Sequence, residues 1–233
     1  MLGAIRHKGF IPWDDDIDVG MPRKDYDEFI RIAPKELGEK YYLDCFEYNK
    51  NYYLPFAKIK KNNTIFDEGY FEDGKMHKGI FIDVFPFENV DKINISLKIR
   101  ANIIRSTVDA VLFKNRIRKL NQFRRPIFVL LLCILSKKQL MNIQHYYLTK
   151  CKNDDSKYIT ALASSCHYLT ETNLKEDILP PKSVSFEGKK YNGVNKHDIY
   201  LSKLYGEYMK LPKEEDRINH MPKQIVFDIK NNN

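Results

Sequence analysis

Residues 6–21 read Arg-His-Lys-Gly-Phe-Ile-Pro-Trp-Asp-Asp-Asp-Ile-Asp-Val-Gly-Met, and four of five consecutive residues in this run are aspartates. Crowded carboxylates repel one another unless a cation lies among them. Alternate side chains of a strand point to the same face, so Asp16 and Asp18 would share one face while Ile17 and Val19 face a core. This pattern favours a divalent cation such as Mg²⁺ over a solvated acidic turn, which is the alternative.

Another carboxylate lies in residues 79–87, Gly-Ile-Phe-Ile-Asp-Val-Phe-Pro-Phe, a run that is otherwise mostly apolar. An unpaired, ionised Asp83 in such a strand would be very costly. A metal ion shared with Asp16 and Asp18 would offset that cost, and an ion pair with Lys or Arg, or an N–H cap from a loop, is the alternative. Asp14 has the same parity as Asp16 and Asp18 and is included as a further ligand, unless it lies in the preceding turn.

The composition limits the class of protein and its partners. The chain has 233 residues, of which 43% are hydrophobic and 30% charged, so we expect one soluble domain, or one with an appended helical part. Its net charge of +8 suits anionic partners, and with no basic arm or nucleic-acid motif we expect no nucleic acid among them. Four cysteines without CxxC spacing, and no signal peptide, favour a cytoplasmic protein.

The pattern along the chain predicts three parts. Residues 1–92 would form the catalytic core, 93–150 a helical insertion, and 151–233 a C-terminal part that completes the same domain. In the core we expect a helix over 23–33 and strands over 41–46, 54–61, 64–66 and 79–87. In the last part we expect a hairpin over 184–191 and a helix over 199–209 that Asp198 caps.

The helical insertion contains the most apolar run of the chain, residues 127–135, and we expect two or three helices broken near Pro126. The run is too short to cross a membrane, which takes about 20 residues. Arg124, Arg125, Lys137 and Lys138 flank it. We favour a buried core helix, and the alternative is an interfacial helix in peripheral contact with the inner membrane.

Residues 2–21 resemble the signature of the LicD family, which comprises bacterial phosphocholine transferases related to the fukutin group. Residues 79–86 resemble the second block of that family, and residues 205–212, followed by Arg217 and His220, resemble its C-terminal block. The resemblance implies an α+β fold, with a nucleotidyltransferase-like mixed β-sheet core flanked by helices.

The resemblance also implies a reaction. Phosphocholine, or a similar phospho-substituent, would pass from CDP-choline or a related donor to a sugar hydroxyl of a glycan such as teichoic acid or lipopolysaccharide. Asp16 and Asp18 would hold Mg²⁺, for which Mn²⁺ is a substitute, and Asp83 would be the third carboxylate and the base for the hydroxyl. The residues assigned to substrate binding are Arg6, Lys8, Trp13, Asp15 and Lys58. For Trp13 we favour packing against the acidic strand over a cage for the quaternary ammonium.

Two rival interpretations remain at this stage. The same fold would support a nucleotidyltransferase that releases pyrophosphate. Family members also carry a Gly-Ser or Gly-Thr turn upstream of Leu2-Gly3, and the sequence begins at Met1. We therefore expect this phosphate-contacting turn to be missing, and a non-catalytic nucleotide-binding remnant is the third interpretation.

Overall fold

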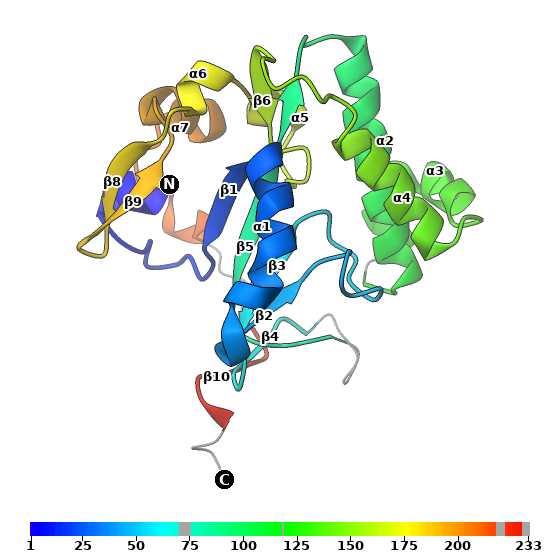
Figure 1. Cartoon of the computed structure of the whole chain (residues 1–233), viewed down its shortest axis with the longest axis horizontal. Helices are drawn as coiled ribbons and strands as arrows, with labels where there is room; N and C mark the ends of the chain where they lie inside the picture. The colour runs from blue at the N-terminus through cyan, green and yellow to red at the C-terminus, as the bar shows by residue number, and fades with distance from the viewer. Residues whose placement is uncertain (70–75, 118, 218–221, 230–233) are drawn as a thin grey trace.

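The computed structural model describes residues 1–69, 76–117, 119–217 and 222–229. Its centre is a six-stranded mixed sheet in which the long strand β5 is shared by two halves (Figure 1). The first half of β5 pairs in parallel with β1 and antiparallel with β3, while its second half pairs antiparallel with β6. The six strands are β1 (Asp18–Pro22), β2 (Tyr41–Asp44), β3 (Ala57–Lys61), β5 (Phe81–Val90), β6 (Tyr158–Thr160) and β7 (Thr172–Leu174).

Helix α1 (Arg23–Glu36) follows β1 directly and covers one face of the sheet, as Figure 1 shows. Its buried residues are Tyr26, Ile30 and Ala33. They pack in one cluster with Ala57 and Val84 of the sheet, both without solvent exposure. The helix predicted over residues 23–33 is therefore confirmed, and the structure extends it by one turn.

The helical insertion forms three helices, which lie together at the right of Figure 1. They are α2 (Ile95–Lys114), α3 (Pro126–Leu132) and α4 (Lys137–Leu148). The side chain of Asn94 caps α2 by accepting from two backbone N–H groups of its first turn. Pro126 is the first residue of α3, where its missing N–H costs nothing, so the break predicted near Pro126 is confirmed.

The expectation of a buried helix over residues 127–135 is wrong in part. Val129 is fully buried against α2 and α4, but Ile127, Leu131 and Ile134 on the other side are exposed. No single helix in the described part of the chain is long and apolar enough to cross a membrane. Helices α3 and α4 taken together are long and apolar enough by length and composition alone, but they meet at a bend of 112°.

The remaining elements are short and lie mostly in the C-terminal third. The hairpin expected over residues 184–191 is confirmed as β8 and β9, and α7 is shorter than the predicted 199–209. The full set is β4 (Ile65–Asp67), β10 (Gln224–Val226), β8 (Lys182–Phe186), β9 (Lys189–Gly193), α5 (Tyr168–Glu171), α6 (Lys175–Ile178) and α7 (His197–Tyr205), with single turns at Gly3–His7, Gly38–Lys40, Leu120–Gln122 and Glu214–Asp216.

Two local predictions are wrong at the ends of elements. Asp198 does not cap α7, because that helix begins at His197 and has no side-chain cap. It ends at Tyr205, since Gly206 has a φ of 66°, which a helix cannot continue. Val19 does not face a core either: it is 39% exposed, because β1 pairs only with β5 among the described strands.

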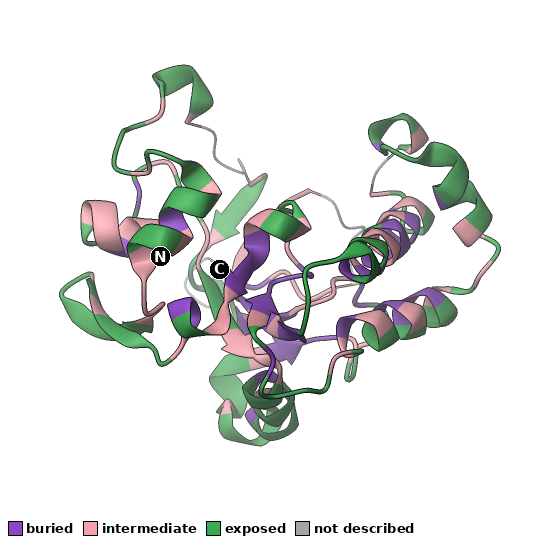
Figure 2. Cartoon of the chain, turned by 90° about the horizontal axis from the view of Figure 1, so that it is seen from above, coloured by how far each residue is buried: buried purple, intermediate pink, exposed green. Residues whose placement is uncertain are grey.

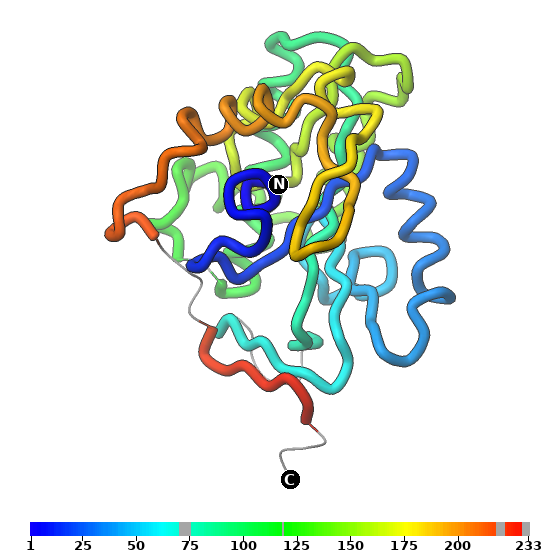
Figure 3. The backbone as a smooth tube through the Cα atoms, turned by 90° about the vertical axis from the view of Figure 1, so that its left-hand side faces the viewer, coloured from blue at the N-terminus to red at the C-terminus, as the bar shows by residue number. Residues whose placement is uncertain are grey.

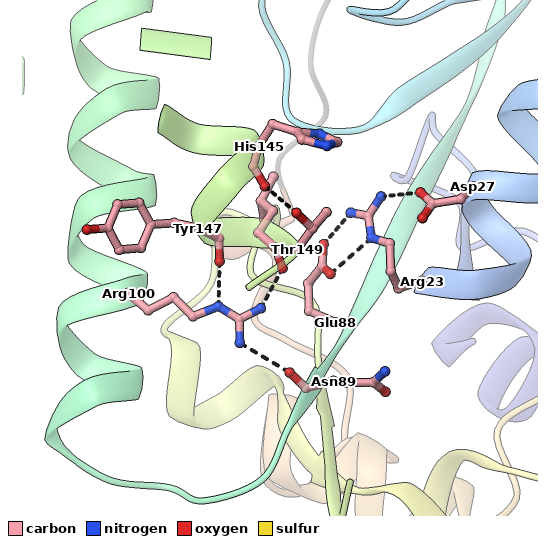
Figure 4. A network of polar contacts seen from close by, with 9 residues as sticks. Arg23, Asp27, Glu88, Asn89, Arg100, His145, Tyr147 and Thr149 are labelled. Carbon is pink, nitrogen blue, oxygen red and sulfur yellow. Dashed lines mark hydrogen bonds and ion pairs between the residues drawn. The ribbon is translucent and has the colours of Figure 1, made fainter. Parts of the chain in front are cut away.

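A buried charged pair joins α1 to β5 (Figure 4). Arg23 donates to both carboxylate oxygens of Glu88, one of them at 3.0 Å, and also donates to Asp27 at 2.8 Å. Glu88 is 1% exposed, and burial raises its pKa while Arg23 opposes the rise. On the other side of the strand, Arg100 of α2 donates to the backbone carbonyls of Asn89, Tyr147 and Leu148. The two arginines thus fix α1 and the helical insertion to the same strand.

Replacing Glu88 with Gln should destabilise the fold by about 3–5 kcal/mol, because Arg23 would lose its buried counter-charge. Urea unfolding monitored by circular dichroism measures this change. Arg31→Ala is the control, since Arg31 makes an exposed pair with Glu28 on the same helix and should change stability little. Equal effects of the two substitutions would contradict the role given to the buried pair.

Candidate functional site

Four charged side chains lie in one row across the first half of the sheet. In the parallel pairing of β1 with β5, Asp18 is opposite Asp83. In the antiparallel pairings that follow, Asp83 is opposite Lys58 of β3, and Lys58 is opposite Asp44 of β2. Residues opposite each other in a sheet project to the same face, so the four side chains share one face. The charges along the row are negative, negative, positive and negative.

Lys58 holds the middle of this row. Its Nζ lies 2.9 Å from one carboxylate oxygen of Asp83 and donates a hydrogen bond to the other at 3.3 Å. The same nitrogen lies 3.3 Å from the centre of the Phe81 ring, a cation–π contact. Asp44 is paired at 2.7 Å with Lys60, so each of the two buried aspartates has a lysine. The structure therefore shows Asp83 paired with a lysine, which was one of the alternatives to a shared metal ion.

The two carboxyl groups at the β1 end of the row hold their protons unusually well. The pKa of Asp18 is raised to about 7, first by burial and then by the charges of Asp16 and Asp83, against an opposing effect of Lys58. The pKa of Asp83 is raised to about 6 by burial, although Lys58 lowers it. At neutral pH the site therefore contains crowded, partly protonated carboxyl groups, which a cation would help to ionise.

The acidic run opens into a cavity of about 710 Å³. Three of its four aspartates line it, at positions 14, 16 and 18, and the other walls come from the N-terminal turn, the β8–β9 hairpin and the segment after α7. The side chains that line the cavity include Arg6, Phe10, Trp13, Phe186, Tyr205, Tyr208, Lys210 and Lys213. Segments from both ends of the chain thus line one cavity, and Figure 3 shows the N-terminal turn (blue) beside the hairpin and the segment that follows α7.

Hydrogen bonds hold these distant segments together. Arg6 donates from its Nη1 to the backbone carbonyl of Tyr208 at 2.8 Å, across 202 positions in the sequence. The carbonyl of Lys8 accepts from the backbone N–H of Glu187 at 2.9 Å, and the carboxylate of Glu187 accepts from the N–H of Phe10 at 3.0 Å. The N-terminal turn is therefore attached on one side to the hairpin and on the other to the segment after α7.

Comparison with known proteins identifies the family. The family described as "LicD/FKTN/FKRP, nucleotidyltransferase domain" matches residues 1–101. The chain is 31% identical over 226 residues to the lipopolysaccharide cholinephosphotransferase LicD of Haemophilus influenzae, covering 94% of this chain and 83% of that protein. The chain belongs to the LicD family. It is also 32% identical over 111 residues to the uncharacterized protein RT0683 of Rickettsia typhi, covering 40% of this chain and 36% of that protein. No solved structure matches significantly.

Membership of the LicD family confirms the recognition made from the acidic run and the fold class, α+β with a nucleotidyltransferase-like mixed sheet. The structure gathers most of the predicted site residues in one place. Asp14, Asp16, Asp18, Arg6 and Trp13 line the cavity. Asp83 and Lys58 are buried in the sheet beside Asp18, whereas Lys8 and Asp15 are exposed and do not line it.

The ring of Trp13 contacts two other side chains. The ring of Trp13 packs edge-on against His7, with centroids 6.0 Å apart, and the Arg217 guanidinium lies 4.7 Å from the ring centre. One face of Trp13 is therefore covered by a cation already, and its packing against the acidic strand stays a prediction. His220 of the C-terminal block lies outside the described residues.

The donor set fits a divalent cation, although it does not enclose one. In the described part of the chain, no three His, Cys, Asp or Glu side chains converge closely enough to surround a metal ion. However, Asp16 and Asp83 raise the pKa of Asp18 by repulsion, which a cation among these carboxylates would relieve. Carboxylate oxygens are the ligands that Mg²⁺ prefers. The metal site of Asp14, Asp16, Asp18 and Asp83 stays a prediction.

Sequence reasoning gave no role to several residues of the cavity wall. Tyr205, Tyr208 and Lys210 lie in the block that resembles the family's C-terminal block, which was the available signal. Phe186 had no such signal, since nothing in the hairpin sequence shows that it packs at 4.9 Å against Phe10. These residues enter the site only through contacts between segments that are far apart in the sequence.

In metal-free protein, Asp18→Asn should stabilise the fold at pH 8 and change it little at pH 4. An unfolded Asp ionises near 3.8, whereas folded Asp18 holds its proton to about pH 7. The folded state therefore binds more protons between these values and loses stability as the pH rises through them. We expect a gain of about 1–2 kcal/mol at pH 8, less than the full pKa shift implies, because Asp18 retains contact with solvent.

Urea unfolding at pH 4, 6 and 8, with a chelator present, measures this difference. Asp25→Asn, the same change at an exposed position of α1, is the control and should not stabilise the fold at pH 8. A difference between Asp18→Asn and wild type that is equal at pH 4 and pH 8 would contradict the repulsion described for Asp18.

Proposed function

We propose that this chain transfers phosphocholine, or a similar phospho-substituent, from a CDP-activated donor to a hydroxyl of a cell-surface glycan. The H. influenzae relative is named a lipopolysaccharide cholinephosphotransferase, and it aligns with 94% of this chain. One observation carries the proposal: the acidic run lines a cavity of about 710 Å³. In the sheet next to this cavity, Asp83 pairs with Asp18 on one side and with Lys58 on the other. That volume is in the range of small-molecule sites.

The proposed donor has complementary groups on the cavity wall. Its pyrophosphate is anionic, and Arg6, Lys210 and Lys213 are the cationic side chains that line the cavity. A trimethylammonium group is attracted to the faces of aromatic rings and to carboxylates. Tyr205 is 58% exposed and lines the same cavity, so its ring is open to such a contact.

The acidic residues have defined parts in this proposal. Asp16 and Asp18, with Asp83 beside them, would hold Mg²⁺ or Mn²⁺, which when bound neutralises charge on the donor pyrophosphate. Asp83 would take the proton of the attacking hydroxyl, because its pKa of about 6 leaves it ionised at neutral pH. Lys58 holds Asp83 in place by the ion pair at 2.9 Å. Since Asp83 does not line the cavity, a role in positioning Asp18 is the alternative.

A second reaction has support from the family description, which names a nucleotidyltransferase domain. In that reaction a nucleotide would be transferred to the acceptor and pyrophosphate released from a nucleoside triphosphate. In the proposed reaction the acceptor oxygen instead forms a bond to the phosphorus that bears choline. The bond from that phosphorus to the bridging oxygen of the pyrophosphate breaks, and CMP leaves with that oxygen. Product analysis after incubation with each donor separates the two, because only one of the leaving groups would be found.

Isothermal titration of CDP-choline into the protein tests the donor site. We expect binding that depends on Mg²⁺ and that weakens by about a hundredfold or more in Asp16→Asn/Asp18→Asn, since metal ligands matter at least as much as the groups that orient them. Asp25→Asn should bind as wild type. Loss of binding in both variants, or binding unchanged by a chelator, would contradict the assignment of these carboxylates. Absence of binding by wild type would exclude choline and require other nucleotide-activated donors to be tried.

Replacement of Asp83 by Asn distinguishes its two proposed roles. If Asp83 is the base, its replacement should lower kcat by a factor of about 10²–10⁴ and leave the dissociation constant of the donor almost unchanged. As a positioning residue for Asp18, it should weaken Mg²⁺-dependent donor binding along with kcat. Steady-state kinetics with an accepted glycan, combined with the titration above, reports both quantities.

A further inference from the structure

Helix α3 is apolar on both of its sides. Val129 is fully buried, and the partly buried Leu132 packs beside it in the cluster formed with α2 and α4. On the opposite side, Ile127 is 75% exposed and Leu131 59% exposed, and Ile134 in the following turn is 83% exposed. A helix that is apolar all round is usually buried, so the exposed side calls for an explanation.

The exposed side chains form one continuous stripe. Ile127, Leu130 and Leu131 are spaced i, i+3 and i+4, which places them along one face of α3, and Ile134 lies in the turn that follows the helix. Phe128, 43% exposed, widens the stripe at the N-terminal end. Contiguous apolar surface of this kind marks an interaction site more often than scattered single residues do. We call these five residues the α3 stripe.

Exposed basic residues flank the α3 stripe on both sides in the sequence. Arg124 and Arg125 immediately precede α3, Lys138 follows it, and Lys119 lies in the turn before, all of them exposed. In the described residues, none of these four side chains forms an ion pair. Residues 92–153 contain fourteen Lys and Arg but a single acidic residue, Asp109. The positive charge of the chain is thus concentrated in the part that carries the stripe.

This combination identifies an occupant. A protein partner or a second copy would match the apolar stripe, but an apolar stripe bracketed by cations and almost free of carboxylates is what the surface of an anionic bilayer attracts. The helix has seven residues, so it can lie in the interface but cannot cross a membrane. It is also at the outer edge of the molecule, on the right of Figures 1 and 2, where a flat surface can approach it.

We propose that the α3 stripe docks this protein on an anionic lipid surface. The side chains of Ile127, Leu131 and Ile134 enter the boundary between headgroups and acyl chains, while Arg124, Arg125 and Lys138 contact the headgroups. The proposal does not depend on the reaction proposed for the cavity. The N-terminal turn and the β8–β9 hairpin, which line the cavity, lie on the opposite side of the sheet from the helical insertion in Figure 1.

Vesicle flotation with the full chain tests the proposal. Vesicles of phosphatidylcholine with about 30% phosphatidylglycerol should carry the protein at about 0.1 M salt, and vesicles of phosphatidylcholine alone should carry much less. Ile127→Ser/Ile134→Ser should lower binding by about tenfold or more, since both apolar contacts are lost. Arg124→Gln/Arg125→Gln should weaken binding and make it less sensitive to salt.

The matched control is Ile95→Ser/Ile199→Ser, the same change at two exposed isoleucines away from α3, which should bind as wild type. All four positions are exposed, so we expect the unfolding midpoints to be nearly unchanged. Failure of wild type to float, equal flotation of Ile127→Ser/Ile134→Ser, or equal binding to both kinds of vesicle would overturn the proposal. So would a dimer in sedimentation velocity that the same substitution dissociates while flotation is unaffected, because the stripe would then bind a second copy.

Discussion

The site depends on the register between β1 and β5. The parallel pairing places Asp18 opposite Asp83. The Asp83 N–H also donates a hydrogen bond to the carbonyl of Ile17 at 3.0 Å, which extends the pairing to the residue before β1. A slip of one residue would place Asp18 on the other face of the sheet, toward the apolar side of α1, and would separate the two carboxylates. The Arg23–Glu88 pair fixes the helix that follows β1 to the same strand, and so opposes such a slip.

The alternation of charge along the sheet explains how polar groups are tolerated in its interior. Lys58 lies between Asp83 and Asp44, and Lys60 pairs with Asp44, so the two lysines and two aspartates are buried together. Each ion alone would be costly to bury, and one of opposite sign beside it offsets most of that cost. Asp18 lies at the end of the row, and in the described strands no lysine is opposite it. The row is therefore charge-balanced in the interior and has excess negative charge where it meets the cavity.

The sequence was sufficient for the parts of the site that lie in one strand or one turn. Alternation of acidic and apolar residues led to the acidic pair, although β1 begins only at Asp18 and Asp16 precedes it. The cost of an ionised carboxylate in an apolar run led to Asp83, and apolar periodicity led to α1 and to the hairpin. The errors have tertiary causes: Val19 is exposed because β1 has a neighbour on one side only, and α7 ends early because of the backbone at Gly206. The pairing of Lys58 with Asp83 needs a register that no local pattern contains. Neither Phe186 nor Tyr205 could be placed near the acidic run before the ends of the chain were brought together.

The contact between Arg6 and Tyr208 has a consequence for synthesis of the protein. During translation the acidic strand leaves the ribosome before the residues around Tyr208, which complete the cavity. A nascent chain therefore contains the carboxylates long before it has a chamber around them. Folding of the sheet can begin early, since β1 to β5 are complete by residue 90, but closure of the cavity must wait until residues 205–213 have been made. The two events are separated in time by the length of the helical insertion and the C-terminal part.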